Sequence, residues 1–190
     1  MQNTTSRRGK NIVLMTLAIG LAVMAMSSFF YRLQGPVQAT SKPASQSAPA
    51  AMSQEKGAEI QKYMAMLQGN SENTEALVGL GELFMQAGSW DKASSFWQRY
   101  LKLESQDEKA IYHYAIALLN LDKFHESVAQ FERLVAINPK NYHGYYYLGM
   151  IHVYYLDDSS KGKEYLQKVI ELNPDDKEIV GVVREELAKM

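Results

Sequence analysis

The chain contains no cysteine and only five prolines among its 190 residues. Without a thiol it can form no disulfide, no thiolate metal centre, no iron–sulfur cluster and no haem attachment through Cys-x-x-Cys-His. It also lacks a glycine-rich phosphate loop, a His-Glu-x-x-His helix and a Gly-x-Ser-x-Gly turn. These absences argue against an enzyme and predict neither a cofactor nor a bound metal.

Acidic residues are missing from the first 53 positions. That segment holds five Lys or Arg residues, whereas residues 54–190 hold the other fifteen and all twenty-one acidic residues, for a net charge of −6. A nucleic-acid backbone attracts basic surfaces, and residues 54–190 contain no cluster of Lys or Arg. We therefore expect no nucleic-acid partner.

One long apolar run is present, near the N-terminus. Ile12 to Phe30 is nineteen residues without a charge, which at about 1.5 Å per residue spans close to the ~30 Å of a bilayer's hydrocarbon core. Arg7, Arg8 and Lys10 precede it, so the positive-inside rule places residues 1–10 in the cytoplasm and a transmembrane anchor at 11–31. In a bacterium this predicts a single-pass protein of the inner (cytoplasmic) membrane whose remaining residues lie in the periplasm.

A cleaved secretory signal is the alternative, because Val37-Gln38-Ala39 has the small residues of a cleavage site. The apolar region of a signal usually has about 7 to 15 residues, so the longer run here favours an uncleaved anchor. Lipoprotein anchoring is excluded, since no cysteine follows the run. Residues 32–53 are rich in Pro, Ala and Ser, which predicts a flexible linker.

Residues 74–176 repeat one pattern three times, at a period of 34 or 35 residues. Within each unit the apolar positions recur at intervals of three and four, which places them on one face of a helix. Small residues stand where two helices of a unit would cross closely: Gly81, Ala115 and Gly149 on the first helices, and Ala93, Ser127 and Gly162 on the second. Each unit therefore predicts a helical hairpin that must stack on its neighbours to bury its apolar face.

The repeated positions resemble the tetratricopeptide repeat (TPR), through pairs such as Leu80-Gly81 and Leu148-Gly149 and through the stops Asn138-Pro139 and Asn173-Pro174. The resemblance implies an all-α, right-handed solenoid of eight helices after the anchor. Its parts are a half-repeat helix at 54–73, repeats at 74–107, 108–141 and 142–176, and a capping helix at 177–190. The third repeat carries one extra residue within 156–160, so we expect a misshapen turn there.

In this family, ligand contacts come mainly from the first helix of each repeat, on the concave side of the array. Carried over position by position, the resemblance assigns a peptide-binding role to Val78, Glu82, Met85, Tyr112, His113, Ile116, Leu119, Asn120, His143, Tyr146, Tyr147, Met150, Val153 and Tyr154. This surface is rich in aromatic and Met side chains, which favours an apolar or amphipathic peptide. The alternative is that the stripe packs internally, against the capping helix or the half-repeat.

Some TPR domains hold the C-terminal carboxylate of a chaperone with Lys, Asn and Arg side chains. The corresponding places here are taken by Val78, Glu82, His113, His143 and Tyr147. The chaperone class is therefore disfavoured as a partner.

Two histidines, His113 and His143, project toward the concave side, where a pair of imidazoles can bind a metal or haem iron. We favour the interpretation that both are polar members of the peptide surface. His152 takes a core position of its repeat and is expected to be buried, whereas His125 follows a hairpin turn and is expected to face solvent.

A single anchor, an outward-facing domain and a half-repeat before three repeats are together similar to the TPR component of the bacterial cytochrome c haem-lyase system. Members of that group bind the C-terminal helices of apocytochromes, which implies a non-catalytic scaffold in cytochrome c maturation. Two alternatives stay open. One is an assembly scaffold for another cell-envelope complex, and the other is a homo-oligomeric organiser whose groove holds a helix of a second copy.

Overall fold

The computed structural model describes the backbone of residues 48–190 and the side chains of residues 55–190. The predicted anchor at 11–31 lies outside these residues. Within them the regular structure is entirely helical, as predicted, and no helix is long and apolar enough to cross a membrane. The eight helices are α2 (Ala48–Gly69), α3 (Thr74–Gln86), α4 (Trp90–Leu103), α5 (Glu108–Asn120), α6 (Phe124–Ile137), α7 (Tyr142–Tyr154), α8 (Ser159–Leu172) and α9 (Lys177–Ala188).

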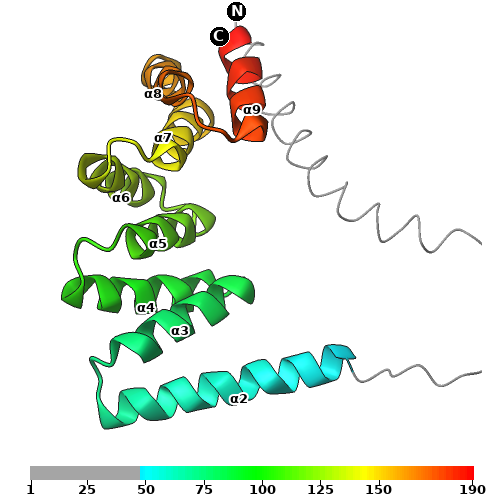
Figure 1. The fold of residues 1–190 in the computed structure, drawn as a ribbon, viewed down its shortest axis with the longest axis vertical. Helices are drawn as coiled ribbons and strands as arrows, with labels where there is room; N and C mark the ends of the chain where they lie inside the picture. Colours follow the sequence, from blue (N-terminus) through cyan, green and yellow to red (C-terminus); the bar gives the residue numbers. More distant parts are fainter. Residues whose placement is uncertain (1–47) are drawn as a thin grey trace, which may run out of the picture. The chain divides into compact units, whose positions relative to one another are not determined.

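The helices of residues 48–190 stack in chain order, each packing mainly on the helices before and after it (Figure 1). Three antiparallel pairs, α3 with α4, α5 with α6 and α7 with α8, are the three predicted hairpins. The helix α2 packs on α3 at one end of the stack, and α9 packs on α8 at the other. The result is a helical solenoid of three hairpins with one additional helix at each end.

The first of these helices is longer than predicted. It begins at Ala48, inside the range assigned to the linker, and not near residue 54. Pro49 falls in its first turn, where a helix tolerates proline because the missing N–H has no partner within the helix. Residues 48–53, which the proline-rich composition assigned to the linker, are therefore part of α2.

The first helix of each hairpin begins at a side-chain cap, and the caps recur with the repeat. The Asn73 side chain accepts a hydrogen bond from the N–H of Ala76, and Asp107 and Asn141 cap α5 and α7 in the same way. Asp158 and Asp176 cap α8 and α9. Such caps satisfy N–H groups that have no partner within the helix, so they fix where each helix starts.

Close helix crossings inside each hairpin pair a large side chain with a small one. Trp97 of α4 is 1% exposed and lies against Gly81 of α3, where an added Cβ would stand 2.7 Å from the indole ring. Leu166 of α8 packs on Gly149 in the same arrangement. In the second hairpin the Ser127 hydroxyl donates a hydrogen bond of 2.9 Å to the carbonyl of Ala115. The predicted small residues at the crossings are confirmed.

The extra residue of the third repeat lies in its hairpin turn. Three residues separate α3 from α4 and α5 from α6, whereas four, Tyr155 to Asp158, separate α7 from α8. Each turn contains one residue with positive φ: Gly88 at 66°, Asp122 at 57° and Asp157 at 53°. Aspartate tolerates the left-handed region better than most residues with a side chain, so the turns close without a second glycine.

Candidate peptide-binding surface

The fourteen residues assigned to peptide binding all lie on α3, α5 and α7, the first helices of the three hairpins. Asn120 is exposed and the other thirteen are half-buried, so none is fully part of the core. Several of their apolar members, including Val78, Met85 and Ile116, pack from the side against the buried core. The surface is thus continuous with the core beneath it and keeps part of each side chain accessible.

Tyr112 stands at the centre of an aromatic cluster that joins α5 to α7. Its ring centroid lies 5.6 Å from His113, 6.1 Å from His143 and 5.8 Å from Tyr147, each in an edge-to-face arrangement. The Tyr112 hydroxyl donates a 3.5 Å hydrogen bond to the hydroxyl of Tyr147. Burial and this bond raise the pKa of Tyr112 above its ordinary value, so the phenol stays neutral at physiological pH.

Aromatic side chains of the second helices α4 and α6 pack against this cluster. The His113 ring stacks on Trp97 of α4 with centroids 5.1 Å apart, and Tyr147 stacks on Phe131 of α6 at 5.0 Å. Burial, followed by the positive charge of Lys109, lowers the pKa of His113. His113 is therefore a neutral ring that packs against the core side of the surface. Among residues 55–190, no group of three or more potential metal-ligating side chains comes together.

A cavity of about 240 Å³ opens beside Tyr112, between the N-terminal turns of α5 and α7. Its walls are the rings of Tyr112 and His143 with the polar side chains of Glu108, Lys109 and Asn141. Sequence analysis did not include Glu108 or Asn141, although Asn141 occupies the capping position that recurs every 34 residues. An apolar side chain of a ligand fits this place, with polar groups at the rim.

A second cavity, of about 370 Å³, lies between α2 and α3. Tyr63 of α2 lies against Gly79 of α3, where an added Cβ would stand 2.5 Å from the phenol ring. The same cavity is lined by the carboxylates Glu75 and Glu82 and by Val78. The sequence analysis did not assign Tyr63 to the site, because it lies in the half-repeat outside the three full repeats.

An ion pair links the two cavities. The Nζ atom of Lys109 lies 2.7 Å from Oε1 of Glu82, and each of these residues lines one of the cavities. The Lys109 side chain is 69% exposed and that of Glu82 is 39% exposed. The hydrogen bond to Glu82 raises the pKa of Lys109. Because the pair stands in solvent, it contributes little to stability and a ligand can displace it.

The third-repeat part of the predicted surface lies against α8 and the C-terminal helix α9. Tyr146, Met150 and Val153 pack in a cluster formed by buried residues of α8 and by Val183 of α9. The Tyr154 hydroxyl donates a hydrogen bond to the carboxylate of Glu186 in α9. Of these four residues, Tyr154 makes the direct contact with α9 that the alternative of packing against the cap predicts. Neither cavity has a residue of α9 in its lining.

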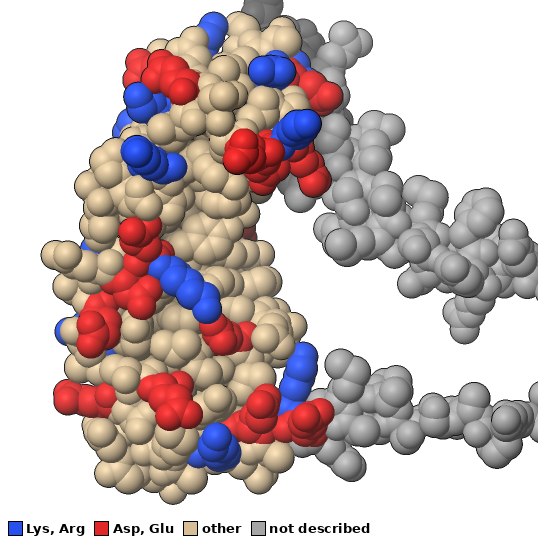
Figure 2. All heavy atoms as spheres, viewed as in Figure 1, with Lys and Arg blue, Asp and Glu red and all other residues tan. Residues whose placement is uncertain are grey.

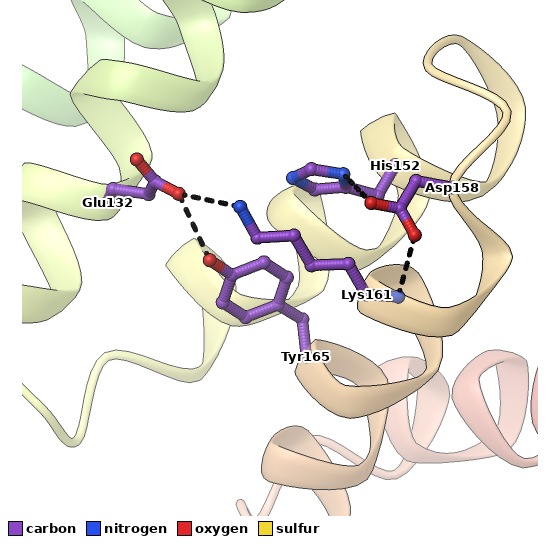
Figure 3. Close-up of polar contacts among 5 residues, drawn as sticks. All are labelled: Glu132, His152, Asp158, Lys161 and Tyr165. Atoms are coloured by element: carbon purple, nitrogen blue, oxygen red, sulfur yellow. Dashed lines mark hydrogen bonds and ion pairs between the residues drawn. The ribbon is translucent and has the colours of Figure 1, made fainter.

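His152 lies away from this surface. It is 5% exposed, as expected for a core histidine, and neither ring nitrogen has a hydrogen-bond partner. Figure 3 shows its nearest charged neighbour, Asp158, with Nδ1 and Oδ2 3.8 Å apart. Beside this pair, Glu132 accepts hydrogen bonds from Lys161 at 3.3 Å and from the Tyr165 hydroxyl at 3.1 Å. Burial, then the charge of Lys161, lowers the pKa of His152.

The other histidine expected to be outside the site, His125, is exposed as predicted.

Charged side chains are unevenly placed over the described residues. On the face shown in Figure 2, acidic and basic groups gather at the two ends of the stack and along one flank, and a broad uncharged area lies between them over α5–α7. An uncharged area between charged ends suits a ligand whose apolar side chains are flanked by charged ones.

The described residues form three stacked helical hairpins, and their first helices carry the candidate surface. This arrangement defines a helical-repeat protein of the solenoid class. Residues 108–141 and 142–176 each match the family model described as "Tetratricopeptide repeat". The hairpins α5–α6 and α7–α8 are therefore tetratricopeptide repeats, as the sequence pattern predicted.

Comparison with known proteins gives the same architecture. The chain is 23% identical over 130 residues to protein O-mannosyl-transferase Tmtc3 of Drosophila melanogaster, a match that covers 65% of this chain and 14% of the fly protein. A crystal structure of MamA superposes with a TM-score of 0.62 at 20% identity, covering 78% of this chain and 91% of MamA. The TPR2B domain of yeast Sti1 in its pHsp70 complex superposes with a TM-score of 0.55 at 15% identity, covering 61% of this chain and 94% of that domain. At these identities the likenesses establish the fold.

Proposed function

We propose that this chain is a non-catalytic scaffold, anchored in the inner membrane by residues 11–31, that binds an apolar or amphipathic segment of a partner protein against α3, α5 and the start of α7. The main support is the aromatic cluster around Tyr112, which remains half-buried on the inner side of the first helices with a cavity beside it. Partly exposed aromatic groups on a folded domain usually mark an interaction surface. They also provide much of the binding energy once a ligand covers them.

The chemistry of the surface restricts the kind of partner. The structurally similar TPR2B domain of yeast Sti1 forms a complex with pHsp70. In this chain the positions of a carboxylate clamp hold Val78, Glu82, His113, His143 and Tyr147, so a chaperone C-terminus lacks its cationic partners. A helix with one apolar face fits better, because it can present side chains three and four positions apart to the cluster.

The C-terminal helix of an apocytochrome c is the first partner that we propose to test. The resemblance to the haem-lyase TPR component supports this choice, and it stays a prediction. We place the repeats in the periplasm on the charge asymmetry around Ile12–Phe30. Two other roles, a scaffold for a different envelope complex and a homo-oligomeric organiser, use the same surface with a different occupant.

A fluorescence-anisotropy titration tests the binding proposal directly. The 190-residue chain in a neutral detergent is titrated into labelled apocytochrome C-terminal peptide, and into a scrambled peptide of equal composition that lacks an apolar face. We expect tighter binding of the native peptide, which Tyr112→Ala weakens and Tyr155→Ala does not. Tyr155 is a matched control, since it is 43% exposed and lies in the third hairpin turn.

The outcomes separate the roles. Equal binding of native and scrambled peptides refutes the peptide-binding proposal. Binding of a generic amphipathic helix without binding of the apocytochrome peptide keeps the scaffold and removes the maturation role. A stable dimer in size-exclusion chromatography with light scattering, together with no peptide binding, favours the homo-oligomeric organiser.

The membrane topology has a separate test, which the absence of cysteine makes simple. A single cysteine introduced at exposed Gln68 is treated, in intact cells with a permeabilised outer membrane, with a maleimide that cannot cross the inner membrane. We expect labelling at this position and none at a cysteine that replaces Ser6. Labelling restricted to lysed cells places the repeats in the cytoplasm and contradicts the proposed topology.

A further inference from the structure

The cavity between α2 and α3 has a different chemistry from the cavity beside Tyr112. Its charged side chains are the carboxylates Glu75 and Glu82, and its other walls include the rings of Tyr63 and Tyr100. Glu75 is exposed and forms no ion pair with any other described side chain. A cavity that combines carboxylates with aromatic faces is suited to a Lys or Arg side chain, whose charge pairs with the acids and whose aliphatic stem packs on the rings.

The shape of this cavity depends on a glycine. With no side chain at Gly79, the ring of Tyr63 lies directly on the backbone of α3, and a Cβ there would overlap the ring at 2.5 Å from two of its atoms. The ring therefore forms a wall of the cavity, beside the half-buried Val78. A flat aromatic wall is the feature that a guanidinium or ammonium group recognises in addition to opposite charge.

The chain already places two cations at the border of this cavity, Lys62 and Lys109. The Nζ atom of Lys62 lies 5.4 Å from the centroid of the Tyr63 ring, where a cation of a ligand would compete with it. Lys109 comes from the next repeat and pairs with Glu82 at 2.7 Å. Since 69% of the Lys109 side chain is exposed, the contact is held by few other interactions. A basic side chain from a ligand would compete with Lys109 for Glu82 and would find Glu75 unpaired. Complementary charge at such a position selects partners more than it adds affinity.

We propose that the partner segment carries a Lys or Arg residue that occupies the α2–α3 cavity against Glu75, Glu82 and Tyr63, next to an apolar residue that occupies the α5–α7 cavity against Tyr112. This inference rests on the proposed function and specifies its ligand as a basic amphipathic helix. The charge difference between the two cavities also orients the helix, with its basic group toward α2 and its apolar group toward α7.

The test uses three synthetic helical peptides of about 18 residues, long enough for roughly five turns. All three carry leucine on one face, and the other face carries lysine, glutamine or glutamate. Each is titrated into the 190-residue chain in a neutral detergent at low salt, with anisotropy as the readout. We expect the Leu/Lys peptide to bind about three- to tenfold more tightly than the Leu/Gln peptide, the range of one partly exposed ion pair with a cation–π contact.

Variants identify the cavity. Glu75→Gln/Glu82→Gln should reduce binding of the Leu/Lys peptide to the level of the Leu/Gln peptide and leave the latter unchanged. Glu126→Gln/Glu164→Gln, which removes two exposed acids from the second helices α6 and α8, controls for net charge and should have no effect. Lys109→Gln should change affinity in the opposite direction and tighten Leu/Lys binding about twofold or more, because it frees Glu82.

Several results would overturn the inference. They are equal binding of the Leu/Lys and Leu/Gln peptides, preference for the Leu/Glu peptide, an equal effect of the two acid-to-amide double variants, or weaker Leu/Lys binding to Lys109→Gln. If the peptides bind with Tyr112-dependent affinity but without charge preference, the proposed function stands and only the basic-group assignment fails. If none of the three peptides binds, the proposed function fails with it.

Discussion

Replacing Gly162 with alanine tests the close crossing of α7 and α8 that shapes the third repeat. A Cβ at this position would lie 3.0 Å from the carbonyl oxygen of Gly149 and 3.1 Å from the amide nitrogen of Val153, and would also contact the Val153 side chain. Both of these distances are to backbone atoms, so a side-chain rotation cannot relieve the overlap. Overpacking of this kind costs about 1 to 3 kcal/mol.

Alanine has an opposing effect, since it is a better helix former than glycine by about 0.5 to 1 kcal/mol. The net change in the free energy of unfolding is therefore a loss of roughly 0 to 2.5 kcal/mol. For a domain near this size, each kcal/mol shifts the melting temperature by about 2 to 4 °C. We expect the midpoint of the helical signal in circular dichroism to fall by up to about 10 °C.

Gly181 is the matched control for this substitution. It is exposed in the middle of α9, and an added Cβ there meets no atom within 4 Å. Gly181→Ala should therefore show only the helix-propensity gain of about 0.5 to 1 kcal/mol and a higher melting temperature. The reasoning is refuted if Gly162→Ala raises the melting temperature, or if the two variants shift it equally.

Two further substitutions test buried polar groups. The pKa of His152 is lowered in the folded chain, so the unfolded chain takes up this proton first as pH falls below about 6.5. The free energy of unfolding therefore decreases as pH falls through that range, by at most about 1.4 kcal/mol per pH unit. His152→Phe should weaken this acid sensitivity, measured as melting temperature between neutral and mildly acidic pH, and an unchanged pH dependence would contradict the assignment. Asp107 caps α5 and accepts a 2.9 Å hydrogen bond from Tyr100, whose pKa burial and this carboxylate raise to about 12. Asp107→Ala should cost about 1 to 2 kcal/mol in thermal unfolding and lower the pKa of Tyr100 in an ultraviolet titration, whereas a titration identical to that of the parent would exclude the contact.

The helices of the repeats could be predicted from the sequence because their signals are local. Apolar spacing and small residues at crossings each act within one hairpin, and the structure confirms the predicted small residues at Gly81 and Ser127. The Asn and Asp caps, such as Asn141, are equally local, but the sequence analysis did not use them. The longer α2 was not predicted, because composition cannot distinguish a proline in the first turn of a helix from a proline in a linker.

The predicted site required information that repeat positions do not contain. A family position states which helix face a residue occupies, but not what else packs on that face. The Tyr154 hydroxyl donates a hydrogen bond to Glu186 of α9, which lies 32 positions away in the sequence. The α2–α3 cavity likewise depends on Tyr63 from a degenerate half-repeat, whose pairing with Gly79 no repeat template describes.

The contact between α9 and the third hairpin has a consequence for the length of segment that the proposed surface could hold. Under the proposed function, a ligand helix that lies along the first helices from α2 would meet the contact between Tyr154 and Glu186 of α9 before it had crossed the third hairpin. As the terminal helix, α9 packs on one neighbour in the stack, whereas each internal helix packs on two. A longer segment would therefore have to compete with Glu186 for the Tyr154 hydroxyl.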